Sequence, residues 1–297
     1  MTVQLKGVFC AALTPLRADL APDHAVFVEH CRSLLAQGCD GVALLGTTGE
    51  ANSFAVAERK ALLESVTAAG ISPTRLLPGT GVSSLTETVE LTRHALALGV
   101  TTVLMLPPFY YKGVPDDGLA AYIGTIVKAT SEKPIPIYLY HFPSQSGLPW
   151  HVKLIARLLD AHKGRIVGLK DSSGDMAYAR AAAGIAKAFD VFPSTEACLI
   201  EARSGVFAGC ISATANLNAD LCQQAWASGD AAALDAAVTI RKLFDGKPLV
   251  SGVKSTLAHI HGDPAWARVA PPLAPFAAAD RASANAGYDA ARAKRVA

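Results

Sequence analysis

Short runs of apolar residues recur along the chain, and a segment with helical periodicity follows each of them. A short apolar run bounded by turn-forming residues is typical of a buried strand. The runs recur at roughly 30-residue intervals, which is the length of one strand–helix unit. Eight of them are predicted strands, at 7–15, 41–46, 75–80, 101–108, 135–143, 165–171, 190–196 and 209–214.

The segment after the first predicted strand illustrates the helical pattern. Its apolar side chains share one face of a helix, and they are Val28, Cys31, Leu34 and Leu35. Gly38 follows, and a glycine at that place commonly ends a helix. The sequence therefore predicts a strand followed by an amphipathic helix, the unit from which parallel sheets are built.

Strand–helix units repeated eight times predict a (β/α)8 barrel in residues 1–217. A doubly wound open sheet is the alternative, but no G-x-G-x-x-G segment follows the first strand. The strand pattern stops near Leu217. Residues 218–297 are alanine-rich, with a proline-rich connector at 270–275. They form a predicted C-terminal helical region that packs on the barrel or on a partner subunit, with helices at 218–228, 230–244, 252–262 and 281–293.

Composition narrows the functional classes. Hydrophobic residues make up 51% of the 297 residues and charged residues 18%, which suits a parallel sheet buried on both faces. The formal net charge is +2 without a block of Lys or Arg, so nucleic-acid binding has no electrostatic support. No apolar stretch approaches the ~20 residues of a membrane span, and the N-terminus lacks a signal-peptide pattern. We therefore expect a cytoplasmic protein that binds neither membranes nor nucleic acids.

The cysteines and histidines are dispersed. None of the 6 cysteines forms a C-x-x-C pair, so reduced thiols in a cytosolic core are expected rather than disulfides or a zinc site. His259 and His261 are close in sequence, but no acidic or cysteine ligand lies near them. The sequence therefore predicts no metal site.

Lys170 ends an apolar strand, at the end of a barrel where active-site residues lie. If Ile166, Gly168 and Lys170 face the barrel interior, the amine is desolvated, which disfavours its charged form. A neutral amine in an apolar pocket attacks carbonyl groups and forms a Schiff base. Position alone equally fits an ion pair with Glu50 or Glu196 on another strand.

Two further features favour the Schiff base. Tyr140 ends the neighbouring predicted strand, and a phenol there can shuttle protons, although core tyrosines are commoner. The sequence "GTTGE" at 46–50 supplies two hydroxyls and several backbone N–H groups suited to a small carboxylate, although it also reads as an ordinary turn. The glycine-rich segment at 79–84 does not match a nucleotide-binding loop and is interpreted as a turn.

Six motifs in order span the predicted barrel: "GTTGE" (46–50), "GTG" (79–81), "PPFYY" (107–111), "YHFPSQSG" (140–147), "GLKDSSGD" (168–175) and "ISATANL" (211–217). Together they resemble the dihydrodipicolinate synthase / N-acetylneuraminate lyase family of pyruvate-dependent class I aldolases. The chain length fits this family as well.

The resemblance implies a role for each matching residue. Lys170 would form the Schiff base with the keto carbon of pyruvate, and Tyr140 would act as the general acid and base above that carbon. Thr47 and Thr48 would bind the carboxylate, with Thr47 also relaying protons from Tyr140. Ile211 would place its backbone beside bound pyruvate. No metal or organic cofactor is implied, only the covalent imine.

The resemblance also implies an assembly. Tyr110 aligns best with a tyrosine that reaches into a neighbouring subunit's site, although the adjacent Tyr111 leaves the register open. Family members are commonly tetramers built from tight dimers, so we expect a homotetramer or a homodimer.

The loop after Tyr140 departs from the family's best-known member. Dihydrodipicolinate synthases carry there an arginine that binds the carboxylate of aspartate semialdehyde, whereas this chain has Gln145. A neutral amide suits a partner with hydroxyls or a carbonyl, unless Lys112 supplies the missing charge. His141 replaces the usual asparagine and should point away from Tyr140.

Other segments bear on regulation and on related activities. Residues 51–60 lack the histidines of the lysine-feedback pocket that some family members have, so we expect no strong control by lysine. The loop typical of neuraminate lyases is also missing.

These features predict a lyase that condenses pyruvate with a small aldehyde or releases pyruvate, as 2-keto-3-deoxy acid aldolases do. One alternative is dihydrodipicolinate synthase with Gln145 in place of the arginine. Another is a non-catalytic protein that binds a keto acid, which the joint presence of Lys170, Tyr140, Thr47 and Thr48 disfavours. A phosphate-binding barrel isomerase would need a glycine-rich loop after the last strands, and 194–205 does not provide one.

Overall fold

The computed structural model describes residues 5–293 of the chain. Parallel strands form two hydrogen-bonded sheets, with the orders β2-β1-β7 and β3-β4-β5-β6. The strands are β1 (Gly7–Ala11), β2 (Gly41–Ala43), β3 (Val103–Met105), β4 (Ile137–His141), β5 (Ile166–Asp171), β6 (Asp190–Pro193) and β7 (Gly209–Ser212).

The third predicted strand is irregular and bridges the two sheets. Leu76 pairs with Val42 of β2, and Gly79 pairs with Leu104 of β3, both as isolated parallel bridges. Pro78 lies between them and has no N–H to donate, so the hydrogen bonds toward β3 are interrupted at this residue. The segment therefore occupies a strand position in the barrel wall without being a continuous strand.

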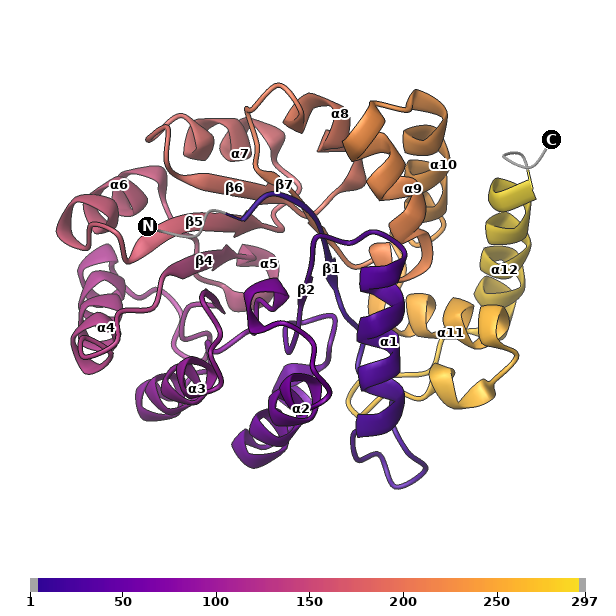
Figure 1. Cartoon of the computed structure of the whole chain (residues 1–297), viewed down its shortest axis with the longest axis horizontal. Coiled ribbons are helices and arrows are strands. Elements are labelled where there is room, and N and C mark those ends of the chain that lie inside the picture. The colour runs from indigo at the N-terminus through magenta and orange to yellow at the C-terminus, as the bar shows by residue number, and fades with distance from the viewer. Residues whose placement is uncertain (1–4, 294–297) are drawn as a thin grey trace.

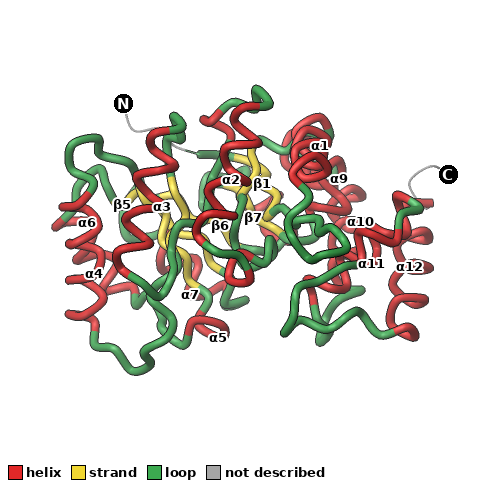
Figure 2. Tube along the Cα trace, turned by 90° about the horizontal axis from the view of Figure 1, so that it is seen from below, coloured by secondary structure: helices red, strands yellow, loops and turns green. Residues whose placement is uncertain are grey.

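The two sheets also meet at a second junction, between β6 and β7. The Ala208 amide donates a hydrogen bond of 2.9 Å to the Val191 carbonyl. These contacts close the strands into a ring. Figure 2 shows the strands in the interior, with helices around them. The predicted (β/α)8 barrel is confirmed.

Helices alternate with the strands and then continue alone to the C-terminus (Figure 1). They are α1 (His24–Ala36), α2 (Val56–Ala68), α3 (Leu85–Ala97), α4 (Asp116–Ala129), α5 (Pro143–Ser146), α6 (Val152–Ala161), α7 (Met176–Ala183), α8 (Leu199–Ala202), α9 (Ala215–Ser228), α10 (Ala231–Lys242), α11 (Leu249–His261) and α12 (Ala278–Ala293). Short 3-10 helices occur at Ala51–Ser53, Pro73–Arg75, Glu196–Cys198 and Pro264–Ala267. None of the helices described here combines the length and apolar character needed to cross a membrane.

Helix α1 shows how the sequence produces these elements. The Asp23 carboxylate accepts a hydrogen bond of 3.1 Å from the Val26 amide, which caps the first turn and is worth about 1 kcal/mol. Phe27, Cys31 and Leu34 are buried on one face of the helix. Burial of this face, rather than helix propensity, therefore holds α1 against the strands.

The apolar side chains form two clusters. The outer cluster lies between strands and helices and contains all 6 cysteines, which are free thiols. Burial raises the pKa of Cys31 and of Cys39 to about 12. The inner cluster fills the barrel and consists of Leu5, Phe9, Ala11, Ala43, Leu77, Leu104, Leu106, Tyr138, Tyr140, Val167, Phe192, Ala208 and Ile211.

The C-terminal helices lie at one side of the barrel, with α11 and α12 near α1 and α9 (Figure 1). Their buried residues, among them Ile240, Leu257 and Tyr288, belong to the same outer cluster as the barrel's. The predicted boundary after Leu217 falls inside α9, where Asn218 departs from helical geometry (φ −143°, ψ 29°). The outer ends of the two predicted regions, residues 1 and 297, lie outside the described residues.

Candidate active site

Lys170 lies near the end of β5, inside the barrel and only 3% exposed. It is in register with Tyr140 of β4 and with Phe192 of β6, and both of these residues belong to the inner cluster. The Lys170 Nζ lies 4.2 Å from the centroid of the Tyr140 ring, within the range of a cation–π contact. The strand therefore aims the amine at the barrel mouth beside the phenol.

One expectation about β5 is wrong. Gly168 does face the interior, because an added Cβ there would lie 2.3 Å from the Tyr138 ring. Ile166, however, packs in the outer cluster, and Val167 packs in the inner one. The register between β4 and β5 shifts at this point, so strict alternation does not extend to the start of the strand.

Across residues 5–293, no hydrogen bond or ion pair engages the Lys170 amine. Both carboxylates considered as its partners are engaged elsewhere. Glu50 forms an ion pair with Lys254, and Glu196 forms one with Arg241. The ion-pair interpretation of Lys170 is therefore wrong, and the amine is available for chemistry.

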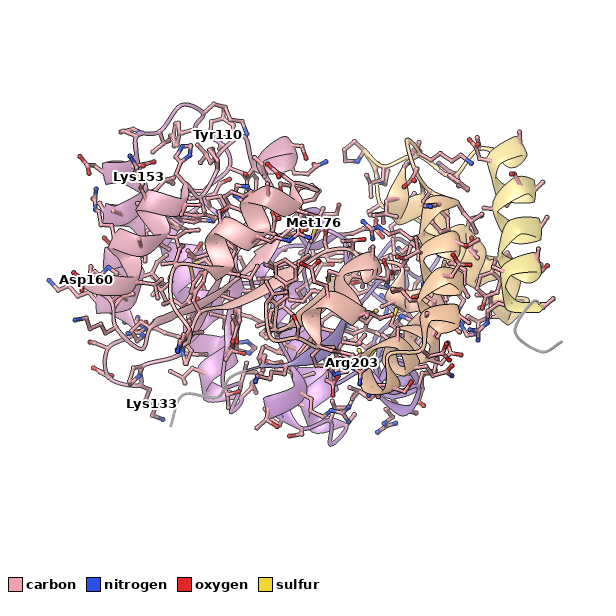
Figure 3. The ribbon with its side chains drawn as sticks, turned by 90° about the horizontal axis from the view of Figure 1, so that it is seen from above. Tyr110, Lys133, Lys153, Asp160, Met176 and Arg203 are labelled. Atoms are coloured by element: carbon pink, nitrogen blue, oxygen red, sulfur yellow. The ribbon has the colours of Figure 1, made fainter. Side chains whose placement is uncertain are left out.

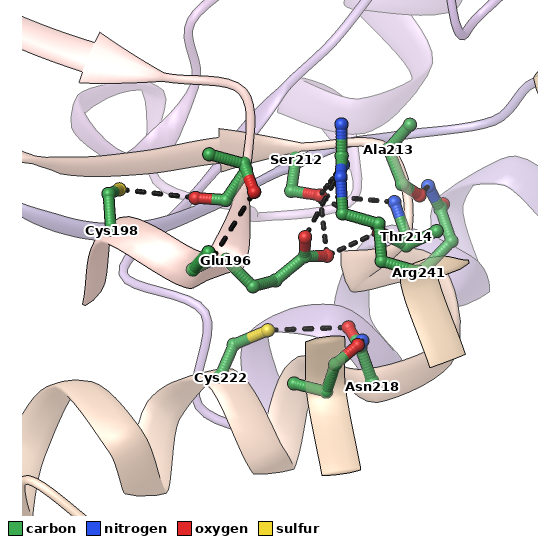
Figure 4. Close-up of polar contacts among 12 residues, drawn as sticks. Glu196, Cys198, Ser212, Ala213, Thr214, Asn218, Cys222 and Arg241 are labelled. Atoms are coloured by element: carbon green, nitrogen blue, oxygen red, sulfur yellow. Dashed lines mark hydrogen bonds and ion pairs between the residues drawn. The ribbon is translucent and has the colours of Figure 1, made fainter. Parts of the chain in front are cut away.

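Figure 4 shows how Glu196 is held. Its carboxylate accepts a hydrogen bond of 2.6 Å from the Ser212 hydroxyl and another from the Thr214 hydroxyl. The Arg241 guanidinium lies 3.3 Å from the second carboxylate oxygen. Because Glu196 is fully buried, this saturated network is what makes its charge tolerable.

Tyr140 and Thr47 meet at the same end of the barrel. The Tyr140 hydroxyl lies 3.5 Å from the Thr47 hydroxyl oxygen, at the long limit of a hydrogen bond. The Trp150 indole N–H donates a hydrogen bond of 3.1 Å to the Tyr140 carbonyl and so holds this end of β4. The structure therefore brings Lys170, Tyr140 and Thr47 together at this end of the barrel.

The loop 46–50 follows β2 and presents Thr47 and Thr48. Thr48 is buried, and Thr47 is half-buried. The Thr14 hydroxyl donates a hydrogen bond of 2.8 Å to the Gly49 carbonyl. A Cβ at Gly49 would lie 3.0 Å from the Ala12 carbonyl oxygen, so a glycine suits this close approach to the barrel wall.

Two predicted residues lie in the loop after β4 or near it. Gln145 is exposed on the short helix α5. The Lys112 Nζ donates a hydrogen bond of 2.8 Å to the carbonyl of Ser146, the residue next to Gln145. The Lys112 amine therefore lies close to Gln145, the residue that stands where dihydrodipicolinate synthases carry an arginine.

Tyr110 lies on the loop after β3, on the face where the strands end. Figure 3 shows it on the side of the molecule opposite Lys133 and Arg203, which precede strands. Tyr110 is 74% exposed, and its ring meets that of Tyr111 edge to face at 5.3 Å. Ile211 is fully buried in the inner cluster, in register with Phe9.

Comparison with known proteins identifies the family of this chain. The model of the "Dihydrodipicolinate synthetase family" matches residues 4–290. The chain belongs to the dihydrodipicolinate synthetase family. An "uncharacterized DapA-like lyase" of Chloroflexus aurantiacus is 32% identical over 96% of each chain. Family membership places the protein among the lyases, the predicted enzyme class.

Two solved structures have the same fold. The dihydrodipicolinate synthase from Agrobacterium tumefaciens strain C58 superposes with a TM-score of 0.90 and 30% identity, covering 96% of this chain and 98% of that one. YagE of Escherichia coli K12, described as a protein of the dihydrodipicolinic acid synthase family in complex with pyruvate, gives 0.88 and 24% identity, covering 98% and 99%. The predicted family and fold are confirmed.

In this member of the dihydrodipicolinate synthetase family, His141 is structural. Its Nδ1 accepts a hydrogen bond of 3.0 Å from the Trp150 amide, and its ring stacks on Tyr178 at 4.1 Å. Burial lowers the pKa of His141 to about 4. It packs behind Tyr140, as expected. In the part of the chain that the structure describes, no three His, Cys, Asp or Glu side chains gather as a metal site would require.

Sequence analysis missed Arg59, which is buried beside the site. It lines a cavity of about 20 Å³ together with Thr47 and Tyr140. Its Nη2 donates a hydrogen bond of 2.8 Å to the Gly79 carbonyl, while its Nε has no partner among the described residues. Burial lowers the pKa of Arg59 to about 10. A signal was present, because Arg59 shares the helical spacing of buried Leu62, Leu63 and Val66.

Proposed function

We propose that this protein is a pyruvate-dependent lyase in which Lys170 forms a Schiff base with the keto carbon of pyruvate. The unpaired, buried amine of Lys170 beside the Tyr140 ring carries this proposal. Such an amine attacks a carbonyl carbon readily.

The proposed reaction uses the constellation in steps. The amine adds to the keto carbon, the carbinolamine loses water, and an iminium ion remains. The iminium accepts electrons, so the methyl group loses a proton and becomes an enamine. The enamine carbon then forms a bond to the carbonyl carbon of an aldehyde, and its oxygen takes up a proton. Water finally releases the product, and the reverse sequence splits a 2-keto-4-hydroxy acid.

Tyr140 is suited to these proton transfers. Its ring lies 4.2 Å from the Lys170 amine and its hydroxyl lies 3.5 Å from that of Thr47, so a proton can pass between the two hydroxyls when they approach each other. In this proposal Thr47 and Thr48 bind the carboxylate of pyruvate, and the backbone of Ile211 lies beside the bound keto acid. The pyruvate complex of YagE, which has the same fold, supports the choice of keto acid.

The carbonyl partner depends on Gln145. A neutral, exposed amide favours a small aldehyde that carries hydroxyl groups, as in 2-keto-3-deoxy acid aldolases. A second candidate is condensation with aspartate semialdehyde, as in dihydrodipicolinate synthase. The Lys112 amine beside Ser146 favours it, because a cation near Gln145 can receive a carboxylate.

The exposed Tyr110 supports an assembly. A tyrosine that is 74% exposed at the barrel mouth is free to reach the site of a second subunit. We therefore propose a homodimer or homotetramer with shared sites. The buried thiols are compatible with the reducing cytoplasm, where we place the protein.

Borohydride trapping tests the Schiff base. Incubation with pyruvate and borohydride, followed by peptide mass spectrometry, should find a stable adduct on Lys170. The Lys170→Ala variant should give none, whereas a variant of the exposed lysine, Lys153→Ala, should behave like the wild type. An absent adduct, or one on another residue, contradicts the proposal. An adduct without turnover of any aldehyde would indicate a non-catalytic keto-acid-binding protein.

A panel of aldehydes tests the partner. Wild-type protein should use neutral hydroxyaldehydes, and Gln145→Arg should shift the preference toward aspartate semialdehyde. Efficient use of aspartate semialdehyde by the wild type would favour the second candidate. Lys112→Met should then raise the KM for that substrate and leave the KM for neutral aldehydes unchanged.

A further inference from the structure

We propose that the ion pair between Glu50 and Lys254 positions the loop 46–50 for the carboxylate of pyruvate. The C-terminal helical region then contributes to the active site through Lys254 of α11. Lys254 is thus a positioning residue that acts through Glu50. This inference rests on the proposed function, because it concerns how the same site holds its keto acid.

The pair is completely enclosed. The side chains of Glu50 and Lys254 are both 0% exposed, and the two residues lie 204 positions apart in the sequence. Lys254 comes from α11, and its Nζ also donates a hydrogen bond of 2.8 Å to the Arg268 carbonyl. The other Glu50 oxygen accepts a hydrogen bond of 2.8 Å from the Ala270 amide. Both oxygens of the carboxylate are therefore bound by α11 and the segment that follows it.

Stability alone does not account for such a pair. Removing two charges from water is expensive, and apolar side chains of similar volume often serve a fold equally well. Burial lowers the pKa of Lys254, which reflects this desolvation. What a buried pair provides is a definite geometry, because each partner has one satisfactory position.

The backbone of the loop needs that geometry. Glu50 has φ 55° and ψ 29°, in the left-handed region that glycine adopts more easily. Leu45, at the other end of the loop, has φ 56°. Strained residues persist only where the surroundings enforce them. A glycine would adopt the Glu50 conformation without strain, so the side chain itself has a purpose.

The loop transmits the position of Glu50 to the reacting groups. The Glu50 amide donates a hydrogen bond of 3.1 Å to the Thr47 carbonyl. The Thr47 hydroxyl in turn lies 3.5 Å from the Tyr140 hydroxyl. A displacement of Glu50 therefore moves the residue that is to bind the carboxylate and relay the proton.

The first test compares two ketones in borohydride trapping. Pyruvate carries a carboxylate, and acetone does not. Lys254→Met should raise the pyruvate concentration for half-maximal adduct about tenfold, which corresponds to about 1.4 kcal/mol, and leave that for acetone unchanged. Arg292→Met is the matched control, because it removes an ion pair between α12 and Asp220 of α9 that does not reach the loop. It should change neither value.

Lys254→Met leaves a buried carboxylate unpaired and can fail to fold. The double variant Glu50→Gln with Lys254→Met removes both charges and keeps side chains of similar volume. It should fold and still show the raised half-saturation for pyruvate. An unchanged pyruvate value in a folded variant overturns the inference, and so does an equal rise for acetone, which would indicate general loosening.

A measurement on the wild type needs no variant. If the pair couples the two regions, binding of pyruvate should slow hydrogen exchange at the Ala270 amide as well as at Glu50. If pyruvate does not change the hydrogen-exchange rate of the Ala270 amide, the inference is overturned. A wild type that forms no adduct on Lys170 refutes the proposed function instead, so the two failures are distinguishable.

Discussion

Among the described residues two lysines are buried, and their surroundings give them opposite properties. Lys254 has a carboxylate and a carbonyl as partners, so its amine is fixed in position. Lys170 has only an aromatic face beside it. The acids that could have neutralised Lys170 are bound by Lys254 and by Arg241. The same residue type is therefore paired at one position and unpaired at the other, which is why we propose chemistry only for Lys170.

Removing the Tyr140 hydroxyl should separate binding from proton transfer. Tyr140→Phe keeps the ring beside Lys170 but should slow exchange of the pyruvate methyl protons for deuterium by about 10²- to 10⁴-fold, as measured by NMR. Tyr138→Phe is the control, because that hydroxyl donates a hydrogen bond of 2.7 Å to Asp190 instead. Equal exchange rates in wild type and Tyr140→Phe would exclude Tyr140 as the acid and base.

His30 should make the protein sensitive to acid. It is buried, and its Nε2 lies 2.8 Å from the Asn216 side-chain oxygen. Burial lowers the pKa of His30 to about 4. In the unfolded chain the histidine pKa is about 6.5, so the unfolded state binds more protons between these values. Stability contributed by the neutral ring is complete above pH 6.5 and is lost as the pH falls toward 4.

The size of this effect can be measured by urea unfolding. Between pH 7 and pH 5, His30 should lower the free energy of unfolding by about 2 kcal/mol. His30→Gln should lack this share of the pH dependence, while His24→Gln, in the same helix, should keep it. Identical pH dependence in His30→Gln and wild type would show that His30 is not responsible.

At the scale of elements, periodicity predicted the helices and the order of the strands well. Periodicity did not predict the details that depend on how neighbouring strands pair. Pro78 turns the third strand into two isolated bridges, and a register shift places Val167 rather than Ile166 inside the barrel. Alternation along one strand contains no information about the register of its neighbour, so neither detail was available from the sequence.

Gly168 shows how closely β4, β5 and β6 approach one another. A Cβ there would lie 2.3 Å from the Tyr138 ring and 2.5 Å from the Asp190 carbonyl. Gly168→Ala should therefore lower the free energy of unfolding by about 1–3 kcal/mol and displace Lys170, with slower trapping of pyruvate. Gly124→Ala, in α4, meets nothing closer than 3.8 Å and should be neutral or slightly stabilising. A stable and fully active Gly168→Ala would contradict this account.

At the scale of the molecule, the site draws on segments that are distant in sequence. Lys170 and Tyr140 were predictable because strand ends converge in a barrel. Lys254 was not, since its partner Glu50 lies 204 residues away and only the folded chain brings them together. Arg59 was accessible in principle, because its helical spacing places it on a buried face. Long-range contacts therefore mark the limit of sequence analysis here.

Subunit mixing should test whether sites are shared. Lys170→Ala subunits and Tyr110→Phe subunits should each be poorly active alone. When they are mixed in equal amounts and reassociated, about a quarter of all sites should be complete, and the mixture should reach about a quarter of wild-type activity. The gain arises because a subunit that retains Lys170 receives Tyr110 from its neighbour. Replacing Tyr110→Phe by Tyr111→Phe in the mixture tests which tyrosine is shared. Absence of any gain in both mixtures would refute shared sites.

The 6 buried thiols have a practical consequence. Each is shielded from solvent and kept protonated by its surroundings, so alkylating reagents react with it only when its part of the chain opens. They are distributed over β1, α1, the segment before β2, the segment before α8, β7 and α9. Pulsed alkylation read by peptide mass spectrometry would thus compare local opening around the barrel, using probes that the native chain already carries.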